Sequence, residues 1–175
     1  LYTLRNERPL EREGMLTVTA RTDRRPLVMA NLLTTSGGDS PETAITEGDG
    51  YMSGTADNVP FAFSTKLSSV YKAGKYETDA LAMSWSDSNI FAAMCTTLGE
   101  NGVLLVKSSE PMTFECSESE MSFSLSDESA VQFHSTLKPS DVLLNGESIG
   151  GYEYDAEKHM VLFTLGAGEG IVVIK

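Results

Sequence analysis

Apolar and polar residues alternate along most of this chain, in short runs with a period of two. Residues 15–22 and 59–65 show this alternation, whereas residues 27–35 and 89–98 are more continuously apolar. A period of two places successive side chains on opposite faces of a β-strand, and a continuous apolar run is typical of a strand covered on both faces. Helical periodicity is nearly absent. The pattern therefore predicts strands.

The second half of the chain predicts shorter strands at intervals of about ten residues. The expected strands cover residues 103–107, 111–116, 121–125, 130–136, 142–144, 152–154, 160–165 and 171–175. Asn101-Gly102 is a pair that favours a two-residue hairpin turn. Roughly a dozen short strands at this spacing indicate a sandwich or barrel, and we expect an all-β, antiparallel β-sandwich with little or no helix.

The length and composition of the chain suit one globular domain. It has 175 residues, of which 41% are hydrophobic and 22% charged, as in ordinary soluble domains. We expect a single β-sandwich over residues 1–175, with residues 1–13 as a linker or first edge segment. No apolar run approaches the ~18 residues of a membrane-spanning helix, so membrane insertion is not expected.

Charge is distributed unevenly. The formal net charge is −12, yet all six arginines lie within the first 25 residues. An acidic body repels phosphate backbones, so nucleic acid is not an expected partner. Arg21, Arg24 and Arg25 are candidate contacts with a neighbouring domain. A solvated strand explains the same residues, and a small anion-binding patch is the further alternative. The acidic runs at residues 115–120 and 127–128 are expected to protect sheet edges.

Two acidic turns are candidate calcium sites. Glu47-Gly48-Asp49-Gly50 and Asp57-Asn58 offer oxygen ligands, which calcium prefers. Asp49 and Asp57 are the candidate ligands, although the order of an EF-hand loop is absent and solvated turns explain the same residues. No other cofactor is expected.

Aromatic side chains are the candidate sugar contacts, because sugar rings present C–H faces that pack on flat π surfaces. The alternation of residues 75–86 places Trp85 on one face with Leu81 and Met83, which favours a core position for it. Tyr51, Tyr71 and Tyr76 lie near glycines or lysines and are expected to be exposed. The other candidates, which share one face of a hairpin strand, are Tyr152 and Tyr154.

Motifs for catalysis are missing. Cys95 and Cys116 form no C-x-x-C or zinc spacing, and a disulfide between them requires neighbouring strands, which the pattern leaves open. His134 and His159 are interpreted as surface strand residues. The chain contains neither a G-x-S-x-G elbow nor a phosphate-binding G-x-x-x-x-G-K-[ST] loop, and no particular pair of carboxylates is marked for glycoside hydrolysis.

The end of the chain carries a family resemblance. Asp141-Val142-Leu143-Leu144-Asn145-Gly146-Glu147 is followed by Tyr152-Glu153-Tyr154-Asp155, by residues 160–165 and by a glycine-rich turn before residues 171–174. These segments resemble the closing strands of β-sandwich domains appended to carbohydrate-active enzymes, and the whole chain resembles the C-terminal sandwich of heparinase II/III-type polysaccharide lyases. In that family the catalytic residues lie largely in other domains, so none is carried over here.

The resemblance implies a non-catalytic accessory module of a secreted polysaccharide-degrading enzyme. Such a module would brace the catalytic domain of a larger polypeptide and contact glycan weakly. It also implies a location outside the cytoplasm: secreted, periplasmic or at the cell surface. Three alternatives stay open, namely a self-sufficient carbohydrate-binding module, a surface or adhesion-type structural domain without a ligand, and a small β-fold enzyme whose convergent catalytic cluster spacing alone cannot reveal. Whether the parent protein is a polysaccharide lyase is left open by the residues themselves.

Overall fold

The computed structural model describes residues 43–175 apart from 57 and 67–68, and its regular elements are all β-strands. This confirms the all-β, antiparallel prediction, with more strands than the expected dozen. No helix in the described part is long and apolar enough to cross a membrane. The fifteen strands are β1 (Thr43–Gly48), β2 (Tyr51–Ala56), β3 (Val59–Ser64), β4 (Tyr71–Ala73), β5 (Tyr76–Thr78), β6 (Ala82–Trp85), β7 (Ile90–Glu100), β8 (Val103–Cys116), β9 (Glu120–Leu125), β10 (Ser129–His134), β11 (Val142–Leu144), β12 (Glu147–Ser148), β13 (Glu153–Asp155), β14 (Met160–Leu165) and β15 (Gly168–Ile174).

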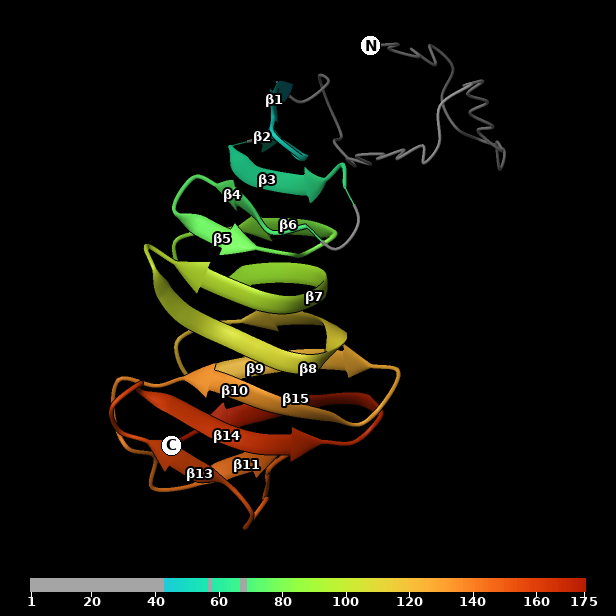
Figure 1. Cartoon of the computed structure of the whole chain (residues 1–175). Coiled ribbons are helices and arrows are strands. Elements are labelled where there is room, and N and C mark those ends of the chain that lie inside the picture. Colours follow the sequence, from blue (N-terminus) through green and yellow to red (C-terminus); the bar gives the residue numbers. More distant parts are fainter. Residues whose placement is uncertain (1–42, 57, 67–68) are drawn as a thin grey trace, which may run out of the picture.

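Two layers share the long hairpin β7–β8 (Figure 1). Layer A runs β1-β2-β3-β6, continues through the first half of β7 and the second half of β8, and ends β9-β15-β11-β12. Layer B contains β4-β5, the second half of β7, the first half of β8, and β10-β14-β13. The two long strands therefore pass from one layer to the other and join them into one continuous sheet.

Irregularities in β7 and β8 make this crossing. The β7–β8 register shifts between Ala92 and Cys95 and again between Cys95 and Thr97, and Met94 has a positive φ of 51°. Such bulges bend a strand and increase its twist. Opposite these bulges, residues 108–111 of β8 have no cross-strand partner in the β7–β8 ladder.

Serine hydroxyls satisfy the backbone where β8 leaves the ladder. Ser108 Oγ donates to the carbonyl of Glu110 at 2.7 Å, and Glu110 N donates to Ser129 Oγ at 3.2 Å. Because these groups keep partners, the strand continues through this region. The sequence pattern predicted two separate strands here, at residues 103–107 and 111–116, and that prediction was wrong.

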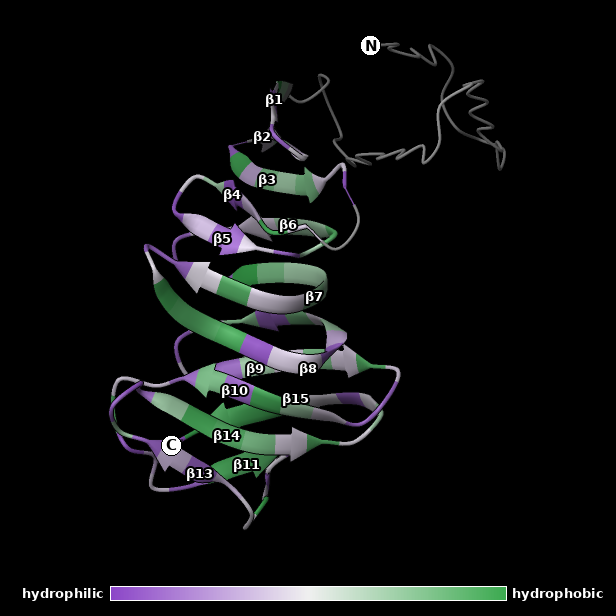
Figure 2. Cartoon of the chain, in the orientation of Figure 1, coloured by the Kyte–Doolittle hydropathy of each residue, from purple (hydrophilic) through white to green (hydrophobic). Residues whose placement is uncertain are grey.

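The core lies between the two layers. Inward-facing residues from both layers form one continuous apolar cluster, and Figure 2 shows hydrophobic residues gathered on the strands with hydrophilic residues in many of the turns. Met83 is buried as expected, but Leu81 precedes β6 and is exposed. The acidic run that begins at Glu115 does not protect an edge, because Glu115 lies on β8 between β7 and β9.

The expected turns are present. Asn101 and Gly102 have φ values of 50° and 84° and join β7 to β8. Asn145 and Gly146, at 52° and 87°, join β11 to β12. Positive φ at both central residues is the requirement of a type I′ hairpin turn, which explains the Asn-Gly sequence at both places.

Candidate functional site

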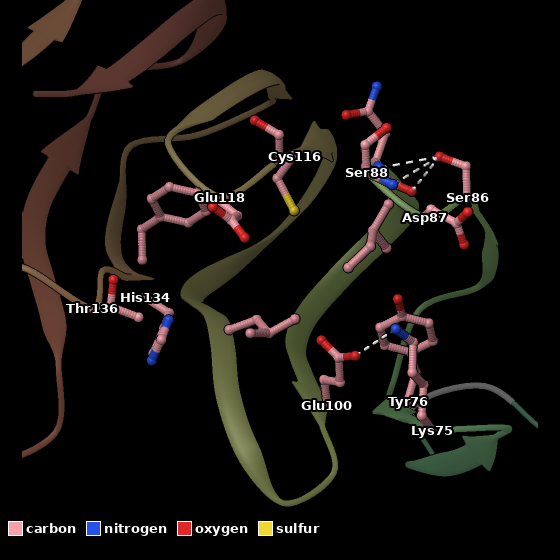
Figure 3. A pocket seen from close by; sticks show the side chains of 15 residues that line it. Lys75, Tyr76, Ser86, Asp87, Ser88, Glu100, Cys116, Glu118, His134 and Thr136 are labelled. Atoms are coloured by element: carbon pink, nitrogen blue, oxygen red, sulfur yellow. Dashed lines mark hydrogen bonds and ion pairs between the residues drawn. The ribbon is translucent and has the colours of Figure 1, made fainter.

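A cleft of about 420 Å³ opens between the two layers at one end of the sandwich (Figure 3). Layer A contributes the β6–β7 and β8–β9 turns, and layer B contributes residues at the ends of β5, β7 and β10 together with one residue of β8. We call this cavity the end cleft. Its lining consists of Lys75, Tyr76, Ser86, Asp87, Ser88, Asn89, Ile90, Glu100, Leu105, Cys116, Ser117, Glu118, Phe133, His134 and Thr136.

Apolar residues line the interior of the end cleft. Ile90, Phe133 and Cys116 belong to the buried core, and Leu105 packs against it. Burial, assisted by the neighbouring Glu115, raises the pKa of the Cys116 thiol to about 12. The thiolate is the nucleophilic form of cysteine, so Cys116 is chemically quiet and acts as an apolar lining group.

One side of the cleft carries an ion pair beside an aromatic ring. Lys75 Nζ lies 2.5 Å from Glu100 Oε1 and 5.1 Å from the centroid of the Tyr76 ring. The hydrogen bond to Glu100 is the largest cause that raises the pKa of Lys75, and a further bond to Tyr76 acts in the same direction. Lys75 is therefore a charged ammonium that already has a carboxylate partner.

The β6–β7 turn is held by its own hydrogen bonds. Ser86 Oγ accepts hydrogen bonds from the backbone amides of Ser88 at 3.4 Å and Asn89 at 3.1 Å. Asn89 Nδ2 donates to Glu115 Oε1 at 3.1 Å, which ties the turn to β8. As a result the turn presents the exposed side chains of Asp87 and Ser88 at the cleft.

The other side of the cleft contains His134, Thr136 and Glu118 (Figure 3). The ring centroid of His134 lies 6.3 Å from that of His159. Burial, followed by the proximity of His159, lowers the pKa of His134, which favours the neutral ring. The interpretation of both histidines as surface strand residues was only partly right: His134 is half-buried in the cleft, and His159 occupies a turn at a φ of 54°.

The tyrosines of β4 and β5 are buried, which corrects their expected exposure. Tyr71 and Tyr76 are 4% and 2% exposed, because the β4–β5 hairpin turns both side chains toward the core and leaves Lys72 and Glu77 outside. Tyr71 stacks on the half-buried Tyr51 of layer A, with centroids 5.3 Å apart and an interplanar angle of 15°. This pair joins the layers, and it places the buried Tyr71 ring against one face of Tyr51.

The remaining aromatic candidates are half-buried and pack against the core. Trp85 packs against the core, the position that its alternation with Met83 favoured, and it contacts Tyr76 edge to face. Tyr152 and Tyr154 also pack against the core, and the Tyr154 hydroxyl donates to the carbonyl of Ser135 at 3.3 Å. Among the six aromatic candidates, Tyr76 alone lines the end cleft.

Of the two calcium candidates, only Asp49 belongs to the described residues. Asp49 is almost fully exposed and pairs with Lys66 at 2.7 Å, which lowers the pKa of its carboxyl. Asp57 lies outside the described residues, as do Arg21, Arg24, Arg25 and residues 1–13. In the described part of the chain, no group of three or more His, Cys, Asp or Glu side chains is arranged to hold a metal ion.

Both cysteines are free and buried. Their strands are neighbours, but Cys95 lies opposite Met112 and Cys116 lies opposite Ile90 in the β7–β8 ladder. The disulfide that the sequence left open is therefore not formed. Burial also raises the pKa of Cys95 to about 12.

A second concave surface lies on the outer face of layer A, and we call it the face groove. It has a volume of about 480 Å³ and crosses β7, β8, β9 and β15. One row of cross-strand partners runs along it, in which Phe91, Glu115, Ser122 and Ile171 follow one another. Phe91 and Ile171 are 39% and 45% exposed.

Sequence reasoning missed most of the end-cleft residues. Lys75, Glu100, Asp87 and Glu118 come from separate turns and strand ends, and no spacing motif connects them. Comparison with known proteins adds nothing to their assignment, since no family model and no curated protein matches the chain. The resemblance to heparinase II/III-type lyases stays a hypothesis.

Proposed function

We propose that this chain is a non-catalytic β-sandwich module of a polysaccharide-degrading enzyme and that it contacts glycan at the end cleft. The observation that carries the proposal is the composition of that cleft, in which an apolar interior is bordered by hydroxyl, amide and charged groups. A sugar ring has the matching chemistry, because it combines C–H faces with hydroxyl groups that need hydrogen-bond partners.

The size of the end cleft supports this reading. Pockets for small ligands enclose roughly 300–1,000 Å³, and the end cleft encloses about 420 Å³. That volume suits one or two sugar units. The cleft is also open between two turns. A polysaccharide longer than the cleft could therefore pass through it, with only one or two of its sugar units bound.

The state of two reactive groups favours binding over covalent catalysis. Cys116 keeps its proton because burial raises its pKa to about 12, and Lys75 is held as an ammonium by Glu100. A nucleophilic role would require the thiolate or the free amine. The parent enzyme's chemistry would then belong to another domain, as the resemblance implies, and its location would be secreted, periplasmic or at the cell surface.

Bracing of the catalytic domain is the second part of the proposal. The exposed Phe91 and Ile171 on the outer face of layer A suit contact with another domain, because exposed apolar groups that gather on one surface commonly mark an interface.

A self-sufficient carbohydrate-binding module is the second candidate function. The observation in its favour is that both layers of the sandwich contribute apolar and polar groups to the same cleft.

Affinity electrophoresis of the chain through gels that contain neutral, amino and acidic polysaccharides tests the glycan contact. Ser88→Trp places a large side chain at an exposed position of the end cleft, and Ser124→Trp makes the same change in the face groove. We expect retardation by at least one polysaccharide, lost in Ser88→Trp and kept in Ser124→Trp. Migration unaffected by every polysaccharide would refute glycan binding and leave only the bracing role.

A further inference from the structure

We propose that the end cleft selects glycans that carry ammonium groups, namely amino sugars, over neutral glycans and over uronic acids. This inference rests on the proposed glycan contact and names its substrate class. It goes against the acidic polysaccharides that the resemblance to heparinase-type lyases would suggest for the parent enzyme.

The charges that line the end cleft are unbalanced. Three carboxylates, Asp87, Glu100 and Glu118, face one ammonium, Lys75. Glu100 neutralises Lys75 at 2.5 Å. Neither Asp87 nor Glu118 forms an ion pair with another described residue. Apart from the His134 ring, the cleft therefore offers two carboxylates to a ligand and no uncommitted cation.

The two carboxylates belong to different turns. Asp87 comes from the β6–β7 turn and Glu118 from the β8–β9 turn, and both side chains are exposed. Figure 3 shows Asp87 beside Ser86 on one side of the cleft and Glu118 on the other side, in the direction of Cys116. A ligand that enters between the turns meets negative charge from both sides.

The apolar interior of the end cleft favours an amino sugar over a bare metal ion as the ligand. Ile90, Leu105 and Phe133 give the cleft apolar surface, whereas a hard metal ion needs six or more oxygen ligands, and the described residues hold no such cluster. A ligand with an apolar ring face and an ammonium group satisfies both parts of the lining. Lys75 shows that the cleft accommodates this chemistry, because its ammonium lies between a carboxylate and the Tyr76 ring.

An anionic sugar would meet repulsion at close and long range. Its carboxylate would approach Asp87 and Glu118, while the one cation of the cleft is already paired. The chain has a formal net charge of −12, and none of its six arginines lies among the described residues. A field of this sign slows the approach of anions within about a Debye length, ~10 Å at moderate salt.

Calorimetry with matched oligosaccharides tests the selection. The probes are a β-1,4-linked glucosamine tetramer, its fully N-acetylated form, which has the same backbone without charge, and a uronic acid tetramer. The pH is kept mildly acidic, so that the amines of the glucosamine tetramer are protonated. We expect the glucosamine tetramer to bind at least about fivefold more tightly than the N-acetylated form, and its affinity to fall with added salt.

Charge-removing variants locate the effect. Asp87→Asn and Glu118→Gln should each weaken the glucosamine tetramer by about two- to fivefold and leave the N-acetylated form unchanged. Glu169→Gln removes the same charge from the face groove and should change neither affinity. Equal or tighter binding of the N-acetylated or uronic acid tetramer would overturn the selection while glycan binding stood. Binding of none of the three tetramers would also overturn it, and glycan binding as such would then be decided by the polysaccharide gels.

Discussion

The ring of Trp85 on β6 meets the ring of Tyr76 on β5 edge to face, with centroids 5.3 Å apart and an interplanar angle of 65°. The two residues come from opposite layers, so this contact joins the layers beside the end cleft. It places the tryptophan in a structural role, because its indole packs on the core instead of standing free as a sugar platform.

Trp85→Ala should therefore lower the free energy of unfolding by about 2–4 kcal/mol, because it removes a half-buried aromatic side chain and its ring partner. Trp85→Phe, which keeps an aromatic ring, should lose less. Urea unfolding followed by circular dichroism measures both. A change below about 1 kcal/mol in Trp85→Ala, together with lost glycan binding in the folded variant, would instead identify Trp85 as a sugar contact.

Asp79 holds the bulge of β7. One of its carboxylate oxygens accepts the backbone amides of Thr96 and Thr97, each at 2.9 Å, and the other accepts the Thr96 hydroxyl. Asp79→Ala would leave two amides without that partner and should lower the free energy of unfolding by about 2–3 kcal/mol. Glu77→Ala, two residues earlier and exposed, should change it by less than about 0.5 kcal/mol. Equal effects of the two substitutions in urea unfolding would contradict this role.

The hydroxyl of Tyr71 is buried without a hydrogen-bond partner among the described residues. A buried polar group without a partner keeps its desolvation cost, about 1–3 kcal/mol. Tyr71→Phe removes the hydroxyl and retains the stacking on Tyr51, so the thermal midpoint should stay the same or rise. A clear fall in the midpoint would show that the hydroxyl has a partner, such as a buried water molecule.

His134 should make stability depend on pH. Burial and the adjacent His159 lower its pKa below the usual value of about 6.5. The unfolded chain then takes up the proton at a higher pH than the folded chain, so the free energy of unfolding falls as the pH drops through about 6.5 and levels off below the folded-state pKa. Above that window His134 is neutral in both states and the penalty is absent. His134→Gln should flatten this part of the profile in urea titrations at a series of pH values, and an unchanged profile would refute the assignment.

The sequence predicted the parts of the fold that depend on local pattern. The alternation of residues 121–125 and 160–165 became β9 and β14, and both Asn-Gly pairs became hairpin turns. Local pattern could not decide which side chains of a short strand point toward the core. Tyr71 and Tyr76 have polar neighbours in sequence, and only the pairing of β4, β5 and β7 turns them inward. Within β8, the amide of Glu110 likewise finds its partner in the Ser129 hydroxyl, which belongs to β10, two strands later in the chain.

The candidate site was less accessible to sequence reasoning than the fold. Lys75 and Glu100 are 25 residues apart, since 100 − 75 = 25, and they meet because Tyr76 pairs with Glu100 across β5 and β7. Asp87 and Glu118 belong to two turns that could be recognised as turns, but their shared end of the sandwich follows from strand order. Residue type and spacing do not indicate the strand order or which turns lie at the same end of the sandwich.

Backbone NMR of the ¹⁵N-labelled chain, titrated with the glucosamine tetramer, locates the glycan contact on the chain. We expect the largest shift changes on the amides of Ser88, Glu118 and His134, which line the end cleft. Changes confined to Phe91, Ser122 and Ile171 would move the site to the face groove and contradict the proposal. A spectrum that does not change at saturating tetramer would contradict amino-sugar binding anywhere on the chain.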